Sequence, residues 1–236
     1  MTIDPAPVPA GVVAELPEGS SRRLHDLGRR IARHVVRPAF RLRARGLERV
    51  PRSGPLVLIA NHSTMIEPQL IFGMLPRRSV FLVKEELFRG GLGWFLHRIG
   101  QVPIRRGVAD RAPLLTAVAV LRGGGVVGVF PEGSRGAGDV ASAERGAAWL
   151  VRTSGAVVLP VATRGTLRPE GTRRRFRPVV DLLVGEPFTV RVGRGRAGLE
   201  EATERLRTEL ACLVHTLDDE RERESRAMGK RKHDRG

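Results

Sequence analysis

The stretch LVLIANHSTMIEPQLI, residues 56–71, joins a buried strand to a helix through a polar turn. Its first five residues form an uninterrupted apolar run typical of a strand buried on both faces, and Pro68 is well placed to begin a helix. Further strands are predicted at residues 79–83, 101–104, 126–130 and 157–162, and further helices at 85–99, 110–122 and near 142–153. Strands that alternate with helices in this way predict a single α/β domain, with a largely parallel mixed sheet flanked by helices.

A basic amphipathic helix is predicted near the amino terminus, at residues 20–39. Leu24, Leu27, Ile31 and Val35 recur at helical spacing, and arginines occupy most of the remaining surface. Such a helix can pack its apolar stripe on the core, or it can lie in the interface of an anionic membrane. Residues 1–19 lack the basic and apolar regions of a secretory signal, and we expect them to form a flexible arm.

The remaining boundaries follow from local composition. Residues 40–45 alternate as a strand does, residues 178–192 predict two more strands that could pair antiparallel, and residues 198–217 predict a terminal helix. The last stretch, residues 218–236, is so densely charged that we expect it to be disordered. The folded domain is therefore expected to span residues 20–217.

The charge balance predicts an anionic partner. The chain has 41 Lys and Arg residues against 25 Asp and Glu residues, a formal charge of +16, and nearly all the cations are arginines. Arginine suits phosphate and carboxylate groups, so an anionic membrane, a phosphorylated substrate or a nucleic acid could bind. Aromatic residues for base stacking are only 4% of the chain, which argues against nucleic acid.

Two further classes of protein fit the composition poorly. The lone Cys212 offers no cysteine cluster, and the other histidines are scattered without metal-ligand spacing, so we expect no metal site. No apolar run approaches the roughly 18 residues that a membrane-spanning helix needs, so any membrane contact should be peripheral.

A histidine and a carboxylate follow the strand at residues 56–60. On a continuous helix, the five residues from His62 to Glu67 would rotate the side chain by about 500° and point the two groups apart. Pro68 disfavours a helical conformation at Glu67, so residues 62–67 should form a turn that can bring the side chains together. A histidine oriented by a carboxylate can act as a general base on a hydroxyl, whereas an isolated histidine would merely cap the strand.

Two other stretches carry groups that suit a phosphate. The sequence VVGVFPEGSRG, residues 126–136, ends a predicted strand in a turn where Gly133 allows close approach and Arg135 can hold an anion. Arg105 and Arg106 follow another predicted strand. Because ligands of α/β proteins collect beyond the carboxyl ends of the strands, these stretches could converge on one site with His62.

The series NHSTMIEP, KEELF with a later GQVPIRR, FPEGSRG and VVLPVA resembles the four ordered motifs of the glycerolipid acyltransferase family, typified by the 1-acylglycerol-3-phosphate acyltransferases. The resemblance covers about residues 46–187. It implies that His62 removes a proton from the hydroxyl of a lysophospholipid, with Glu67 orienting His62. The hydroxyl would then attack an acyl thioester carried by coenzyme A or an acyl carrier protein, and no bound cofactor is implied.

The resemblance also implies a set of substrate-binding residues. Arg105 or Arg106 and the FPEGSR turn would hold the acceptor phosphate, Lys84 would lie along the path of the thioester or of the phosphate, and the proline of VVLPVA would shape the acyl pocket. The set is Asn61, Lys84, Arg105, Arg106, Glu132, Gly133, Ser134, Arg135 and Pro160. One departure stands out, because the family normally has Asp at the position of Glu67. The added methylene shifts the carboxylate by roughly 1.5 Å, a displacement that can cost about 100-fold in rate.

Two alternatives to an active acyltransferase remain open at this point. A nonenzymatic basic module that binds nucleic acid explains the charge, but it does not explain the order of the motifs. A degenerate acyltransferase fold that binds lipid without turnover would explain Glu67. The main interpretation predicts a cytoplasmic protein that is peripheral on the inner face of the cell membrane, with an anionic membrane surface as partner and no nucleic acid.

Overall fold

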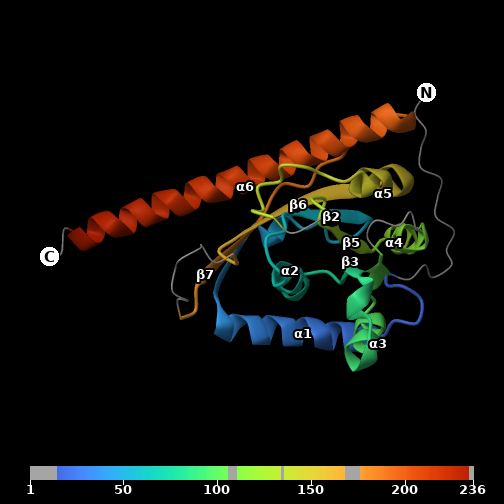
Figure 1. Cartoon of the computed structure of the whole chain (residues 1–236), viewed down its shortest axis with the longest axis horizontal. Helices are drawn as coiled ribbons and strands as arrows, with labels where there is room; N and C mark the ends of the chain where they lie inside the picture. The colour runs from blue at the N-terminus through green and yellow to red at the C-terminus, as the bar shows by residue number, and fades with distance from the viewer. Residues whose placement is uncertain (1–14, 106–110, 134–135, 168–175, 234–236) are drawn as a thin grey trace.

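A computed structural model describes residues 15–105, 111–133, 136–167 and 176–233 (Figure 1). The helices are α1 (Arg22–Ala39), α2 (Glu67–Met74), α3 (Gly90–Arg98), α4 (Ala112–Arg122), α5 (Gly146–Ser154) and α6 (Gly195–His233), with short 3₁₀ helices η1 (Leu47–Arg49) and η2 (Glu85–Leu87). The strands are β1 (Arg41–Arg45), β2 (Leu56–Ala60), β3 (Ser79–Lys84), β4 (Val102–Ile104), β5 (Val126–Val129), β6 (Val157–Arg164) and β7 (Val179–Val184).

The seven strands form one mixed sheet in the order β1-β7-β6-β2-β5-β3-β4. The five strands from β6 to β4 are parallel, and the pair β1 and β7 runs in the opposite direction because β7 is antiparallel to β6. The predicted largely parallel α/β sheet is therefore confirmed. Strand β2 lies between β5 and β6, so groups that follow these three strands meet at one edge.

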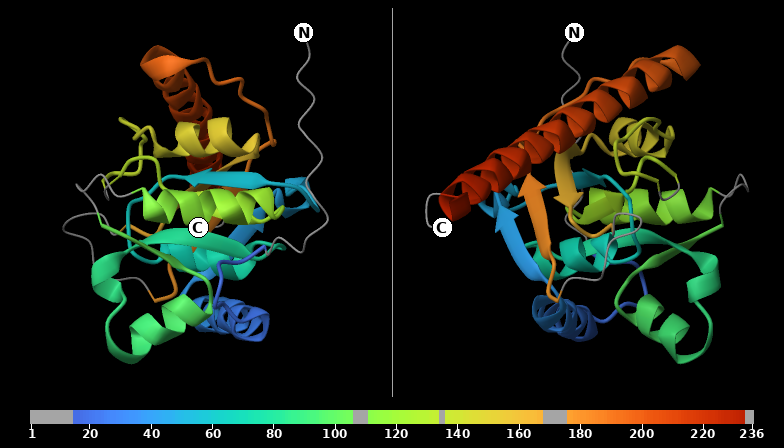
Figure 2. Two further views of the ribbon diagram at one scale, coloured as in Figure 1. Left: turned by 90° about the vertical axis from the view of Figure 1, so that its right-hand side faces the viewer. Right: turned by 60° about the vertical axis from the view of Figure 1, so that its left-hand side comes forward.

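Helices cover both faces of the sheet, as the two views of Figure 2 show. Along β2, Val57 and Ile59 pack into the core beneath α4, α5 and α6, whereas Leu56 and Leu58 pack with α1, α2 and α3. All four side chains are fully buried. An uninterrupted apolar run was the expected signature of such a strand, because neither of its faces meets water.

The prediction of a second strand within residues 178–192 is wrong. After β7, the chain makes only an isolated antiparallel bridge between Phe188 and Val158. The physical reason is that β7 already pairs with residues 161–164 of this edge of β6. Phe188 lies opposite Val158, so the residues beyond Thr189 run past Val157, where β6 begins.

The prediction that residues 218–236 are disordered is wrong as far as His233, where α6 ends after 39 residues. Ion pairs with the sheet anchor the part of this helix up to Glu224. Glu220 lies 2.8 Å from Arg45 of β1, and Arg221 pairs with the buried Asp181 of β7. Charges that predicted solvation of a free tail instead pair with β1 and β7, where the long helix α6 runs past this side of the sheet (Figure 1).

The predicted flexible arm needs a smaller correction. Residues 1–14 lie outside the described residues, but Leu16 is only 5% exposed and belongs to the core beneath α4. The predicted helix at residues 20–39 is confirmed as α1. Among the described residues, no helix is long and apolar enough to cross a bilayer.

Candidate active site

Asn61 extends the sheet beyond the end of β2 with its side chain. Ala60 pairs with Val161 in the register of β2 and β6, so Thr163 is the next residue of β6 that faces β2. The Asn61 Nδ2 group donates to the Thr163 carbonyl at 3.0 Å, and the Thr163 N–H donates to Asn61 Oδ1 at 2.8 Å. A carboxamide carries both a donor and an acceptor, so it can replace a backbone peptide in the ladder while the chain turns away.

This arrangement assigns Asn61 a positioning role, although substrate binding was the expectation. The residue is fully buried, and its Nδ2 group also donates to the carbonyl of Gly138 at 3.2 Å. Both ends of the amide therefore have partners within the protein. The consequence is a fixed exit direction from β2, which sets the position of His62.

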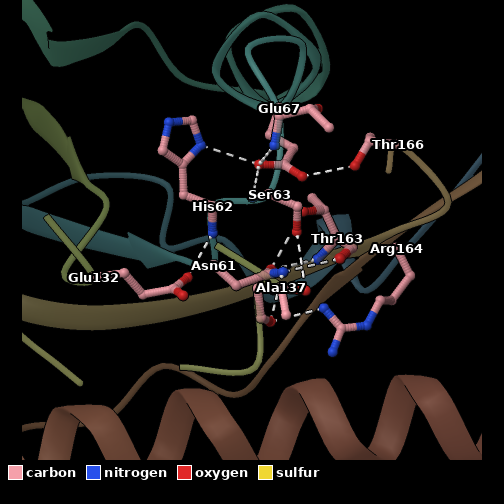
Figure 3. Close-up of polar contacts among 11 residues, drawn as sticks. Asn61, His62, Ser63, Glu67, Glu132, Ala137, Thr163, Arg164 and Thr166 are labelled. Atoms are coloured by element: carbon pink, nitrogen blue, oxygen red, sulfur yellow. Dashed lines mark hydrogen bonds and ion pairs between the residues drawn. The ribbon is translucent and has the colours of Figure 1, made fainter. Parts of the chain in front are cut away.

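A turn ending at Ile66 brings His62 and Glu67 together as expected, although Glu67 itself is helical, because Pro68 is the second and not the first residue of α2. Nδ1 of His62 lies 3.1 Å from Oε2 of Glu67, and the glutamate is the first residue of α2, with Pro68 next in that helix (Figure 3). A carboxylate only accepts hydrogen bonds, so Nδ1 donates and Nε2 keeps the lone pair. Nε2 is thus the ring nitrogen that can take a proton from a hydroxyl.

Four donors surround the buried carboxylate of Glu67. In addition to His62, the backbone N–H groups of Ser63 and Thr64 donate to Oε2 at 2.7 and 3.1 Å. The hydroxyl of Thr166 donates to Oε1 at 2.7 Å. Glu67 has no exposed surface, and a buried carboxylate needs such hydrogen bonds to offset the loss of water.

Strand β5 contributes two contacts to His62. Glu132 follows this strand and its Oε1 accepts a hydrogen bond from the His62 backbone N–H at 2.7 Å. Burial raises the pKa of Glu132 above its ordinary value, an effect that this hydrogen bond opposes and the charge of Asp139 reinforces. Phe130 lies against the imidazole, with ring centroids 4.5 Å apart. Glu132 therefore supports the backbone of the histidine, where contact with phosphate was expected.

The remaining predicted residues are dispersed. Lys84 is exposed at the end of β3, and Arg105 follows β4 and pairs with Glu85 at 2.6 Å. Strand β4 lies three positions from β2 in the sheet, which corresponds to about 14 Å. Arg105 therefore lies beyond contact with His62, at a distance that only a bound substrate would span. Pro160 is buried in β6 opposite Ile59.

The FPEGSR turn is described only in part. The N–H of Gly133 donates to the Phe130 carbonyl at 3.2 Å, within a turn where the glycine has a left-handed φ of 67°. This glycine thus shapes the turn. The predicted residues Arg106, Ser134 and Arg135 lie outside the described residues.

Sequence reasoning missed three residues of this site, all in the segment that ends β6. Thr163 binds Asn61, Arg164 donates to the Gly138 carbonyl at 2.7 Å, and Thr166 binds Glu67 (Figure 3). The segment is about 100 residues from His62 in the sequence. Its position directly after the predicted strand at 157–162 was the available signal, because that strand ends at the same edge of the sheet.

The structure also bears on metal binding. Within residues 15–105, 111–133, 136–167 and 176–233, no three or more His, Cys, Asp or Glu side chains gather as a metal site would require. Near His62, the side chains of Asn61, Glu67 and Glu132 are hydrogen-bonded to other groups of the protein. The arrangement is suited to proton transfer by an imidazole.

The fold and the site together define a class of protein: an α/β enzyme whose histidine, oriented by a carboxylate at the carboxyl end of the sheet, can act as a general base. Comparison with known proteins identifies the family within this class. Residues 41–164 match the model of the Acyltransferase family. The chain belongs to this family, which decides between the acyltransferase interpretation and the nucleic-acid-binding alternative in favour of the former.

Individual relatives agree. The chain is 30% identical over 144 residues to the 1-acyl-sn-glycerol-3-phosphate acyltransferase of Bacillus subtilis, which covers 60% of this chain and 70% of that protein. It is 26% identical over 142 residues to the human 1-acyl-sn-glycerol-3-phosphate acyltransferase beta, covering 58% of this chain and 51% of the relative. The crystal structure of the 1-acyl-sn-glycerophosphate (LPA) acyltransferase PlsC from Thermotoga maritima has a TM-score of 0.59, with 25% identity and 79% coverage of each chain.

Proposed function

We propose that the protein transfers a fatty acyl group from an acyl thioester to the free hydroxyl of 1-acylglycerol-3-phosphate, in the biosynthesis of phospholipids. The contact of 3.1 Å between His62 and Glu67, in a chain of the acyltransferase family, is the observation that carries this proposal. The relatives are acyltransferases of 1-acylglycerol-3-phosphate, and the same acceptor is proposed for this protein.

In the proposed reaction, Nε2 of His62 accepts the proton of the acceptor hydroxyl while the hydroxyl oxygen bonds to the thioester carbonyl carbon. Glu67 stabilises the imidazolium that forms, through the hydrogen bond at Nδ1. Collapse of the tetrahedral intermediate breaks the C–S bond, and the sulfur leaves with its electron pair. The imidazolium returns the proton to the sulfur, so the products are an ester and a free thiol, and His62 is again neutral.

The expected phosphate contacts and the acyl donor are part of the proposal. Arg105 or Arg106, together with the FPEGSR turn, would hold the acceptor phosphate through charge-assisted hydrogen bonds, and Lys84 would lie along the path of the thioester or of the phosphate. The donor is an acyl thioester of coenzyme A or of an acyl carrier protein, and no bound cofactor takes part.

We further propose that α1 and α3 attach the protein to an anionic membrane at the inner face of the cell membrane. In α1, His25 and Gly28 face the core, where a Cβ atom on Gly28 would lie 3.4 Å from Phe95 of α3, and of the apolar stripe Leu24 packs against the core. Leu27 and Ile31 are left 43% and 48% exposed, and Trp94 of α3 is 60% exposed. Apolar side chains beside a basic helix surface suit the interface of an anionic bilayer.

An assay of thiol release tests the catalytic part. Purified protein would be supplied with lysophosphatidate and with either palmitoyl coenzyme A or a palmitoylated acyl carrier protein. We expect free thiol and phosphatidate to form in equal amounts with at least one donor. An absence of product with both donors would contradict the proposed function.

A liposome assay tests the membrane part. The double variant Leu27→Ser with Ile31→Ser should sediment less with vesicles that contain anionic lipid than the parent protein does. Leu115→Ser is a matched control, because Leu115 is 57% exposed but lies on α4, which covers the other face of the sheet. Equal sedimentation of the double variant and the parent would refute this surface.

A further inference from the structure

The end of β6 turns back toward Glu67 after its contact with Asn61. The turn is made at Gly165, whose φ is 88° and where a Cβ atom would lie 2.1 Å from the Val179 carbonyl oxygen. A residue with a side chain would therefore be both strained and in collision with β7. This turn places the hydroxyl of Thr166 at 2.7 Å from Oε1 of Glu67.

The two oxygens of Glu67 have different partners. Oε2 accepts from Nδ1 of His62 and from two backbone N–H groups, whereas Thr166 is the hydrogen-bond donor found at Oε1 among the described residues. The terminal torsion of a glutamate is broad, so one ordered oxygen leaves the carboxylate plane free to rotate. A donor at the second oxygen fixes this plane, and with it the direction of the hydrogen bond to His62.

We infer that Thr166 is a positioning residue that fits the glutamate at position 67 to the histidine. The inference rests on the proposed function of the dyad formed by His62 and Glu67. The glutamate side chain, longer than that of an aspartate, reaches His62 with one oxygen and Thr166 with the other. Three donors hold Oε2, so with an aspartate a shortening of roughly 1.5 Å would lengthen the contact of 2.7 Å with Thr166 to about 4.2 Å.

The first experiment measures kcat and KM for Thr166→Val, which keeps the shape of the side chain and removes the hydroxyl. We expect kcat to fall by about tenfold, which is the effect of one hydrogen bond to a charged group, while KM for both substrates changes by less than twofold. Thr166→Ser restores the hydroxyl and should recover kcat to within twofold. Thr216→Val is a matched control on α6, where the hydroxyl binds only the carbonyl of Cys212, and it should leave kcat unchanged.

A double-mutant cycle tests the fit between the two side chains. If Glu67→Asp already breaks the contact with Thr166, adding Thr166→Val should lower kcat by less than twofold further. The inference would be overturned if the fold reductions in kcat of Glu67→Asp and of Thr166→Val multiplied in the double variant. It would also be overturned if the kcat of the Thr166→Val variant equalled that of the parent.

A measurement that needs no catalysis separates this inference from the proposed function. Nitrogen NMR of histidine-labelled protein reports which ring nitrogen of His62 carries the proton, with His62→Ala identifying the signal. The parent and Thr166→Ser should show the Nδ1–H form, and Thr166→Val should show a larger share of the Nε2–H form. Identical spectra for all three would overturn the inference, whereas an absence of acyl transfer by the parent alone would overturn only the proposed function. Thr166→Ala provides the same test if the valine variant does not fold.

Discussion

Replacement of Asn61 by alanine should destabilise the protein strongly, because this side chain continues the hydrogen-bond ladder of β6. Alanine removes the partners of both the N–H and the carbonyl of Thr163, and these groups are buried. The Gly138 carbonyl keeps its bond from Arg164 at 2.7 Å. Two orphaned backbone groups, at about 1–3 kcal/mol each, predict a loss of about 4 kcal/mol from the free energy of unfolding.

Urea unfolding followed by circular dichroism measures this loss through the shift in midpoint at constant slope. The matched control is Thr163→Val, which removes only the hydroxyl bond to Asn61 at 3.2 Å and should cost about 1 kcal/mol. A loss below about 1 kcal/mol for Asn61→Ala would refute the reasoning, because the amide would then not be replacing a backbone partner.

Three further predictions concern other parts of the molecule. Burial lowers the pKa of His25 from 6.5 to about 4, so between these pH values the unfolded chain binds a proton that the folded protein does not. The free energy of unfolding should therefore fall by about 3 kcal/mol as pH drops from 6.5 to 4. His25→Asn should abolish that fall in urea titrations, and equal pH profiles of variant and parent would contradict the assignment. Glu132→Gln keeps an oxygen that accepts from the His62 backbone N–H and should retain kcat within about threefold, whereas Glu132→Ala should lower kcat by about tenfold. Equal losses of kcat in the two variants would contradict this role, because the negative charge of Glu132 would then be what matters. Arg221→Ala removes the ion pair with buried Asp181 and should speed amide hydrogen exchange beyond residue 218 of α6 by at least about tenfold, and unchanged exchange would contradict the anchoring of α6.

The parts of the fold that the sequence predicts well are those where local pattern and packing agree. The short run from Leu56 to Ala60, bounded by turn residues, favours a strand buried on both faces, and Pro68 favours the start of a helix just after the turn that brings His62 to Glu67. Both features depend on residues close together in the sequence. They also locate the site, since the end of a central parallel strand is where such side chains meet.

Long-range partners explain what the sequence did not predict. The order of α6 beyond Leu217 depends on charged residues of β1 and β7. Arg43 of β1 lies 181 residues from its partner Glu224, and Asp181 of β7 lies 40 residues from Arg221, so charge density within residues 218–236 alone indicated disorder. Likewise Thr163 and Thr166 have no chemical mark that distinguishes them from surface threonines. Their roles arise from the order of β6 beside β2 and from the turn at Gly165, which only the assembled sheet defines.

Glu67, where the family normally has Asp, also has a partner that the sequence does not reveal. From the sequence, an extra methylene indicates a carboxylate displaced from its family position and a possible loss of turnover. In the structure, the longer side chain reaches His62 and Thr166 together, and two backbone N–H groups complete its hydrogen bonds. This geometry favours an active dyad over a degenerate one.

The rate of thiol release by the His62→Ala variant is the most direct test of His62 as the general base of an acyl transfer. With lysophosphatidate and the preferred acyl thioester, the rate should fall by about 10³-fold relative to the parent, while the midpoint of urea unfolding stays close to the parent value. His215→Ala, at an exposed position of α6, is the matched control and should retain the full rate. A His62→Ala variant that kept more than about a tenth of the parent rate would contradict the account.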